Sequence, residues 1–315
     1  MLEIKNKIKK FWLFYYIIPI VVLLSIIITR CYLIFNCIDH TTGFYVQPNF
    51  ITHLFDYSVI LIALGGILYS FFGSPENDNS SKITFSRWQS IMLGIVSLIV
   101  GTFLIYTFII THKNHQPISF IPLGIQNQSA FFAKFKNHTT YIMPYICLIS
   151  AIVMLIQAFV LILNTQVKFL SAGFFKALYL FPITWLTFTI MRIVLAYTTI
   201  FFISEHILEV LALIFILRAF FSQAEIVTFG QANQFLLKSC KIAAFFSTLF
   251  CAVATLPLYL LKIVSPELLY FNNNLYYNNL LLLISVFGIY NLAIYIILTT
   301  KNHSSEENIG SPAAN

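Results

Sequence analysis

Residues 89–111 read QSIMLGIVSLIVGTFLIYTFIIT, a long apolar stretch that contains no charged side chain. A membrane-spanning helix needs about 20 mostly apolar residues, because the hydrocarbon core of a bilayer is about 30 Å thick. The stretch does not alternate between apolar and polar residues, so it is not a strand of a membrane barrel. It therefore predicts a membrane helix, the only other structure that satisfies its own backbone hydrogen bonds in lipid.

Seven further stretches of the chain share this character, which predicts an all-α fold: a polytopic bundle of about eight membrane helices. They lie at 11–29, 55–72, 141–163, 174 to about 196–202, 206–221, 241–261 and 279–299. The fifth and sixth stretches run together, since residues 174–221 are apolar with little interruption. Pro19, Pro182 and Pro257 fall inside stretches and are expected to kink their helices.

The overall composition excludes most other classes of protein. Hydrophobic residues make up 59% of the chain and charged residues only 9%, against about 25% charged residues in an ordinary soluble domain. A soluble enzyme, a disordered chain and a nucleic-acid-binding domain are therefore excluded, and the lipid bilayer is the expected partner. The chain carries no phosphate-binding loop, no HExxH zinc motif and no GxSxG nucleophile motif. We therefore predict neither an enzymatic activity nor a cofactor.

Lysine and arginine predict the orientation of the chain. With eight spans, most of them fall on segments that share a side with the N-terminus, and such segments are usually cytoplasmic. Both termini are therefore predicted to be cytoplasmic. Lys113, Lys134 and Lys136 oppose this assignment, because they lie in a loop predicted on the other side. Residues 1–300 are expected to form one transmembrane domain, followed by a disordered tail at 301–315.

Two pairs of small residues predict close contacts between helices. Gly66 and Ser70 are four residues apart in the second stretch, and Ser97 and Gly101 are four apart in the third. Small residues at this spacing let two helix backbones approach each other in a membrane. They predict packing and not an activity.

Two segments resemble each other and predict a repeat. Thr41-Thr42 precedes His53-Leu-Phe-Asp56, and Thr198-Thr199 precedes His206-Ile-Leu-Glu209, each before an apolar helix. The match fits two parallel four-helix repeats, at 1–163 and 174–300. The spacings differ between the two copies, so the sequence leaves open whether the repeat is real.

The same residues form a candidate binding site. Residues three apart share a helix face, so His53 lies beside Asp56 and His206 beside Glu209. If a repeat axis brings the pairs together, two imidazoles and two carboxylates suit a transition metal, of unknown identity, or a proton relay. The alternative is that these polar residues cap the first turns of their helices.

Arg192 is the one basic residue placed well inside a predicted span, and Glu209 lies close to it across a short turn. Burying a charge in lipid costs several kcal/mol, so such residues are usually paired or functional. Arg192 and Glu209 therefore predict either a structural ion pair between two helices or part of a binding site for a solute or an ion.

One patch resembles a known family. Cys37-Ile-Asp-His-Thr-Thr-Gly-Phe-Tyr45 is similar to a D-x-x-T-G-F stretch of multipass membrane proteins of clostridial Firmicutes, with Asp39, Thr42, Gly43 and Phe44 in the matching positions. His40 departs from the proline that these sequences often carry. A second patch, Tyr197-Thr-Thr followed by Ser204-Glu205, is also similar. The resemblance implies a multi-pass protein of a bacterial plasma membrane and implies no activity.

Together these features predict an integral membrane protein that transports a small solute or ion, or a membrane subunit of such a transporter. The alternative is a non-catalytic protein that assembles with, or regulates, another membrane protein. Polar residues that face a shared interior favour the first function. A stripe of small residues that faces lipid, around a packed interior, favours the second.

Overall fold

A computed structural model describes most of the chain between residues 21 and 309. The described residues are 21, 24–38, 46, 49–72, 86–113, 130–163, 177–196, 203–229, 234–265 and 275–309. Within these ranges the regular structure is helical, as predicted from the sequence.

Eight main helices are present in the described part of the chain. They are Leu24–Asn36, α2 (Phe50–Phe72), α3 (Arg87–Lys113), α4 (Ala130–Ile162), α6 (Leu180–Ala196), α7 (Ile203–Phe229), α8 (Gln234–Val264) and α9 (Leu275–Ile309). Five of them contain a stretch that is long and apolar enough to cross a membrane: Arg87–Lys113, Tyr141–Ile162, Ile207–Ile226, Leu236–Val264 and Asn279–Thr299.

The predicted number of eight spans is not confirmed. Leu24–Asn36, Phe50–Gly66 and Leu180–Val194 are shorter apolar helices in the described residues, and most of the first predicted span, 11–29, lies outside them. The short α6 has a local cause. Pro182 has no N–H to bond the carbonyl of Leu178, and the chain forms a turn at Tyr179 before α6 begins at Leu180. Pro182 therefore lies in the first turn of a helix.

The ends of two helices also differ from the prediction. α4 begins at Ala130 within the predicted outer loop, and α9 continues to Ile309 in the predicted disordered tail. Glu306 and Glu307 are good helix formers, and such residues favour the extension of a preceding helix. Residues 310–315 lie outside the described residues.

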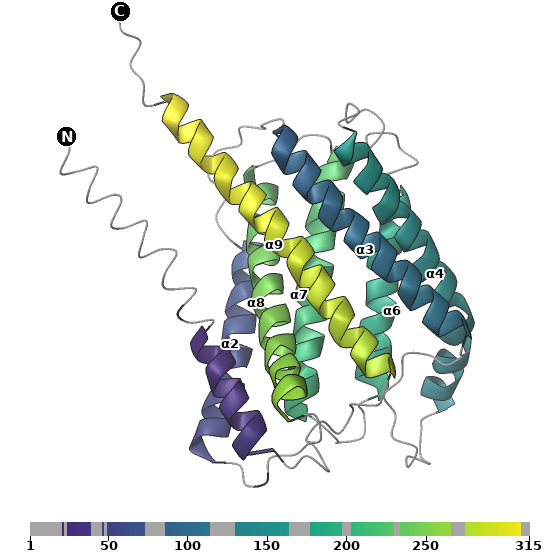
Figure 1. Cartoon of the computed structure of the whole chain (residues 1–315), viewed down its shortest axis with the longest axis vertical. Coiled ribbons are helices and arrows are strands. Elements are labelled where there is room, and N and C mark those ends of the chain that lie inside the picture. Colours follow the sequence, from purple (N-terminus) through teal and green to yellow (C-terminus); the bar gives the residue numbers. More distant parts are fainter. Residues whose placement is uncertain are drawn as a thin grey trace, which may run out of the picture.

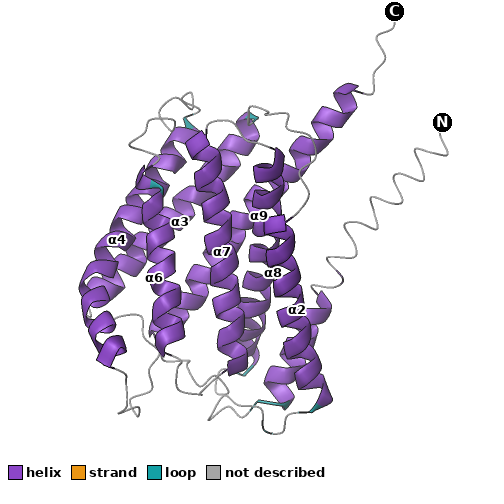
Figure 2. Cartoon of the chain, turned by 180° about the vertical axis from the view of Figure 1, so that it is seen from behind, coloured by secondary structure: helices purple, strands orange, loops and turns teal. Residues whose placement is uncertain are grey.

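Five helices close into a ring. α3 packs on α4, α4 on α6, α6 on α7, α7 on α9 and α9 on α3. In Figure 1, α3 and the long α9 lie in front of the other helices. From behind, α4, α6, α7, α8 and α2 follow one another across the molecule (Figure 2). The ring places one face of each of its five helices toward a common interior.

The remaining helices form a second layer outside the ring. α8 packs along both α7 and α9, and α2 packs on α8. Helix Leu24–Asn36 is joined to α8 by Arg30, whose Nη1 donates a hydrogen bond of 2.7 Å to the Val253 carbonyl. Arg30 is a buried residue of this helix.

The two predicted four-helix repeats are not confirmed by the packing. In such a repeat, α2 and α3 would correspond to α7 and α8. α7 packs closely along α8, whereas α2 packs on α8. The two halves of the described chain therefore use their helices differently.

Small residues make the close helix contacts that the sequence predicts. A β-carbon placed on Gly101 of α3 would lie 2.8 Å from Leu155 Cγ of α4, and one placed on Gly66 of α2 would lie 2.9 Å from the Phe246 ring of α8. Gly94 and Gly288, for which no close contact was predicted, lie similarly close to Ile162 and to Cys251, respectively. These glycines therefore lie at contacts between helices of the same chain.

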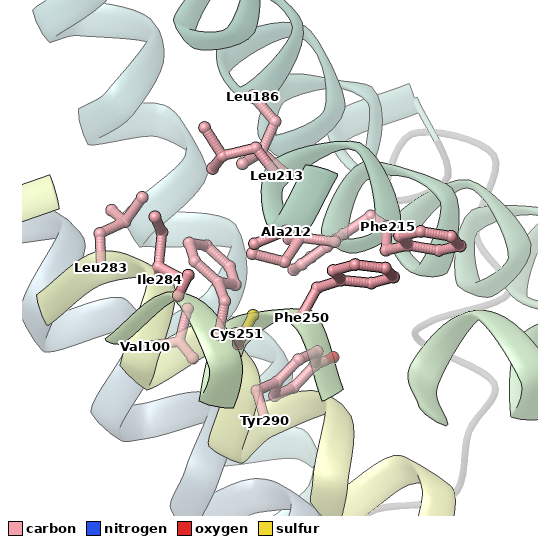
Figure 3. Close-up of a cluster of buried hydrophobic side chains, with 14 of the residues drawn as sticks. Val100, Leu186, Ala212, Leu213, Phe215, Phe250, Cys251, Leu283, Ile284 and Tyr290 are labelled. Carbon is pink, nitrogen blue, oxygen red and sulfur yellow. The ribbon is translucent and has the colours of Figure 1, made fainter. Parts of the chain in front are cut away.

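Aromatic side chains fill the contact between α7, α8 and α9. Figure 3 shows the Phe215 and Phe250 rings lying one over the other, with centroids 5.1 Å apart and planes 4° apart. Tyr290 of α9 lies nearby, beside Cys251 (Figure 3), and its ring stacks on Phe220. Tight packing of this kind stabilises a bundle in lipid, where apolar side chains gain little by leaving the solvent.

Candidate functional site

A cluster of polar side chains occupies the interior of the five-helix ring. Each of four ring helices contributes one residue, and a fifth comes from the turn before α6: Ser97 of α3, Gln157 of α4, Tyr179, Gln223 of α7 and Tyr290 of α9. All five are buried. We call this set the Tyr–Gln cluster. Its members come from distant parts of the sequence and meet only because the ring closes.

Hydrogen bonds connect the tyrosines and glutamines of the cluster continuously. Tyr290 Oη donates to Gln223 Oε1 at 2.9 Å, and Gln157 Nε2 donates to Tyr290 Oη at 3.3 Å. Tyr179 Oη lies 3.1 Å from Gln157 Oε1 and 3.2 Å from Gln223 Oε1. Ser97 lies near Tyr290, and its Oγ donates a hydrogen bond of 2.7 Å to the Leu93 carbonyl of its own helix.

The cluster has hydrogen-bonding capacity to spare. Gln223 is 8% exposed, yet its Nε2 has no hydrogen-bond partner among the described residues. Tyr179 has a single hydroxyl proton for two acceptor oxygens, so it satisfies one of them at a time. A buried donor without an acceptor costs about 1–3 kcal/mol. The Gln223 amide can therefore donate a hydrogen bond to a further polar group.

Removing one hydroxyl should show how strongly the cluster holds the ring together. We expect Tyr290→Phe to lower the free energy of unfolding by about 1–3 kcal/mol, because Gln223 Oε1 loses its shortest hydrogen bond inside the bundle. The matched control is Tyr106→Phe on α3, whose side chain is exposed and for which we expect a change below about 0.5 kcal/mol. Denaturant unfolding in detergent measures both, and equal effects would contradict the assignment.

A second polar level lies toward the other end of the ring. Arg192 is 13 residues after Tyr179 in the sequence. Met143 is 14 residues before Gln157 on α4, and Glu209 is 14 residues before Gln223 on α7. At about 1.5 Å per residue, these positions are about 20 Å along their helices from the Tyr–Gln cluster. Thr107 of α3 and Asn279 of α9 face each other toward the same end, with Oγ1 and Oδ1 3.4 Å apart.

Arg192 makes an unusual contact for a buried guanidinium. Its side chain is 6% exposed, and Nη1 donates to the thioether sulfur of Met143 at 3.2 Å. Nη2 is buried and has no hydrogen-bond partner in the described part of the chain. A thioether is only a weak acceptor. The guanidinium therefore lies in the bundle with most of its hydrogen-bonding capacity unused.

Arg192 and Glu209, both within the described residues, do not form the predicted ion pair. Both side chains are buried, and α6 packs on α7, but the hydrogen bond of Arg192 goes to α4. Both residues are buried, on helices that are neighbours in the sequence and in the structure. The sequence did not predict the rotation of α6, which turns Arg192 toward Met143.

Only part of the predicted site of two histidines and two acidic residues lies within the described residues. His53 is exposed on α2, where its ring stacks on Tyr57 with centroids 6.3 Å apart, and Asp56 is half-buried on the same helix. His206 lies in the first part of α7, and its side chain is outside the described residues. Among the described residues, no three His, Cys, Asp or Glu side chains are grouped to hold a metal ion.

The first turn of α2 is capped by residues other than His53 and Asp56. Asn49 Oδ1 accepts a hydrogen bond of 3.0 Å from the Thr52 N–H, and Thr52 Oγ1 accepts one of 2.9 Å from the Asn49 N–H. This reciprocal pair caps the helix. His53 and Asp56 follow the cap and are not needed for it.

The Tyr–Gln cluster was not predicted from the sequence, because the predicted site residues are histidines and charged residues. Gln157 lies inside the fourth predicted span, and a glutamine within an apolar stretch is itself a signal. Gln223 lies two residues beyond the end of the sixth predicted span, so it was not recognised as a polar residue inside the bundle. Tyrosine is common at membrane interfaces, so Tyr179 and Tyr290 carry little information by themselves.

Comparison with known proteins adds no family. No protein-family model, no curated protein and no solved structure matches the chain. Of the two patches that resemble clostridial membrane proteins, residues 39–45 and 197–199 lie outside the described residues, and Ser204 and Glu205 lie at the start of α7. The function must therefore be argued from the side chains of the bundle.

Proposed function

We propose that this chain is a multi-pass protein of a bacterial plasma membrane that carries a small polar solute through the five-helix ring. The Tyr–Gln cluster forms one binding station in this path. The observation that carries the proposal is the spare capacity of Gln223 Nε2, a buried donor at the centre of a network contributed from all around the ring.

The physical argument rests on the cost of polar groups in lipid. A glutamine or tyrosine in a dry helix bundle must bond with other protein groups, and an unmatched group costs free energy. Buried donors in a structural tie between helices are mostly paired, because each unpaired donor costs free energy. In the cluster, Gln223 Nε2 has no acceptor among the described residues. An available donor of this kind is expected of a site that exchanges a solute for water.

The basic residues support an orientation for the path. Arg218, Lys238 and Lys241 lie toward the end of the bundle that contains the Tyr–Gln cluster, where α7 ends and α8 begins. Arg218 Nη2 donates to Ser239 Oγ at 2.7 Å across this junction. Basic residues favour the cytoplasmic side. The cluster is therefore the cytoplasmic station, and both termini lie in the cytoplasm.

The test is whether a water-soluble reagent reaches the cluster. In a variant without native cysteines, we expect Ser97→Cys to react with the cationic thiol reagent MTSET in detergent solution. Ile99→Cys, two residues away on the exposed face of α3, is the matched control, because detergent covers it. Labelling of position 97 well above position 99 supports a wet interior.

The opposite result would favour the second function. If neither position reacts with MTSET, the cluster is a dry tie between helices, and the chain is better explained as a non-catalytic membrane subunit that assembles with a partner protein. The inward-facing glycines at positions 66, 94, 101 and 288 argue against that function, because they serve contacts within the chain.

A further inference from the structure

Arg192 needs a partner that the described protein atoms do not supply. The guanidinium is a permanent cation with five N–H donors, and one of its two terminal nitrogens, Nη2, has no acceptor among the described residues. Its other terminal nitrogen bonds to Met143 Sδ, which is neutral and accepts weakly. Isolating a cation in this way is expensive in a bilayer. An oxyanion in front of Arg192 would offset that cost.

The surroundings of Arg192 suit a planar, two-oxygen ligand. The side chain projects from α6 toward α4, where Pro144 follows Met143 directly. Pro144 lies inside α4 and has no N–H, so the Thr140 carbonyl lacks its usual helical partner. A guanidinium matches a carboxylate or phosphate with two parallel hydrogen bonds, which a thioether cannot provide.

We propose that Arg192 binds the oxyanion group of the carried solute, a carboxylate or a phosphate, between α4 and α6. The inference rests on the proposed function, since it names the solute class and a second station on the same path. Arg192 lies about 20 Å from the Tyr–Gln cluster along α6, so a small solute occupies the two stations in turn. An anionic lipid headgroup offers the same chemistry.

Thermal unfolding in an uncharged detergent tests the proposal without any transport assay. The probes are sodium benzoate and inorganic phosphate, with sodium chloride at equal ionic strength as the reference. We expect at least one probe to raise the melting temperature of the wild type in a saturable manner. Arg192→Gln should weaken the apparent affinity at least tenfold, or about 1.4 kcal/mol, while Met191→Leu, at an exposed position of the same helix, should retain it.

The design separates the outcomes. A second variant, Arg192→Lys, keeps the charge and loses the paired geometry, so it should bind more weakly than the wild type even if Arg192→Gln fails to fold. Equal stabilisation of Arg192→Gln and the wild type would overturn the proposal. The proposal would also be overturned if the wild type responds to neither soluble probe and is equally stable in nanodiscs of phosphatidylglycerol and of phosphatidylcholine.

The nanodisc arm distinguishes the two sources of the oxyanion. Arg192-dependent stabilisation by phosphatidylglycerol alone would identify a lipid headgroup as the ligand and support the oxyanion site. Reagent access to Ser97→Cys is independent of Arg192. If that access is found and no oxyanion binds, only the Arg192 site fails, and the proposed function stands with another solute class.

Discussion

Replacing Gly101 with leucine is expected to destabilise the helix bundle by at least about 2 kcal/mol. A β-carbon at this position would lie 2.8 Å from Leu155 Cγ and 3.3 Å from the Ala151 carbonyl oxygen of α4. The second contact is with backbone, which cannot rotate away, so α3 and α4 must separate. Separation would break the most extensive contact in the ring and loosen the interior that the ring encloses.

The chain offers a matched control for this change. Gly65 of α2 has no atom within 4 Å of a β-carbon placed on it, so Gly65→Leu adds the same side chain where there is room. We expect that variant to be as stable as the wild type or more stable, since leucine favours the helix. Denaturant unfolding in detergent compares the two. Equal losses would mean that Gly101 does not set the α3–α4 distance.

The second large effect is expected at Arg30. Pro257 has no N–H, so the Val253 carbonyl in the middle of α8 lacks its helical partner. Arg30 Nη1 supplies the missing donor at 2.7 Å, and its side chain is 2% exposed. Arg30→Met should therefore lower the free energy of unfolding by about 1.5–3 kcal/mol, as expected for a lost hydrogen bond to a charged group.

A double-mutant cycle isolates this contact. In Pro257→Ala, the backbone N–H gained at position 257 can also bond to the Val253 carbonyl. We expect Arg30→Met to cost at least about 1 kcal/mol less in this background than in the wild type. The same cost in both backgrounds would show that Arg30 acts through its other contacts and not through the proline break.

The sequence predicted the helices better than their roles. Apolar length alone located the helices that became α3, α4, α7, α8 and α9, because the thickness of a bilayer fixes the length of a span. Small residues also revealed part of the packing, at Gly66 and Gly101. These features depend only on local composition and spacing.

Features that depend on helix rotation and pairing could not be predicted in this way. Pro257 was visible as a helix break, but the residue that compensates it, Arg30, is far away in the sequence. Arg192 and Glu209 were found by their charge, but the neighbour toward which Arg192 turns, Met143, was not. Gln223 becomes notable only when tyrosines from two other parts of the chain are placed beside it. Hydropathy carries no information about contacts between residues that are far apart in the sequence.

The sidedness of labelling at Ser97 tests the central claim most directly. The claim is that the five-helix ring encloses a path across the membrane, open to one face and then to the other. The Ser97→Cys variant, reconstituted in sealed vesicles in a known orientation, is exposed to MTSET from outside only and, in a parallel sample, from the lumen only. The account predicts labelling from both faces, with Ile99→Cys unreactive. Labelling from one face only, or from neither, would contradict it.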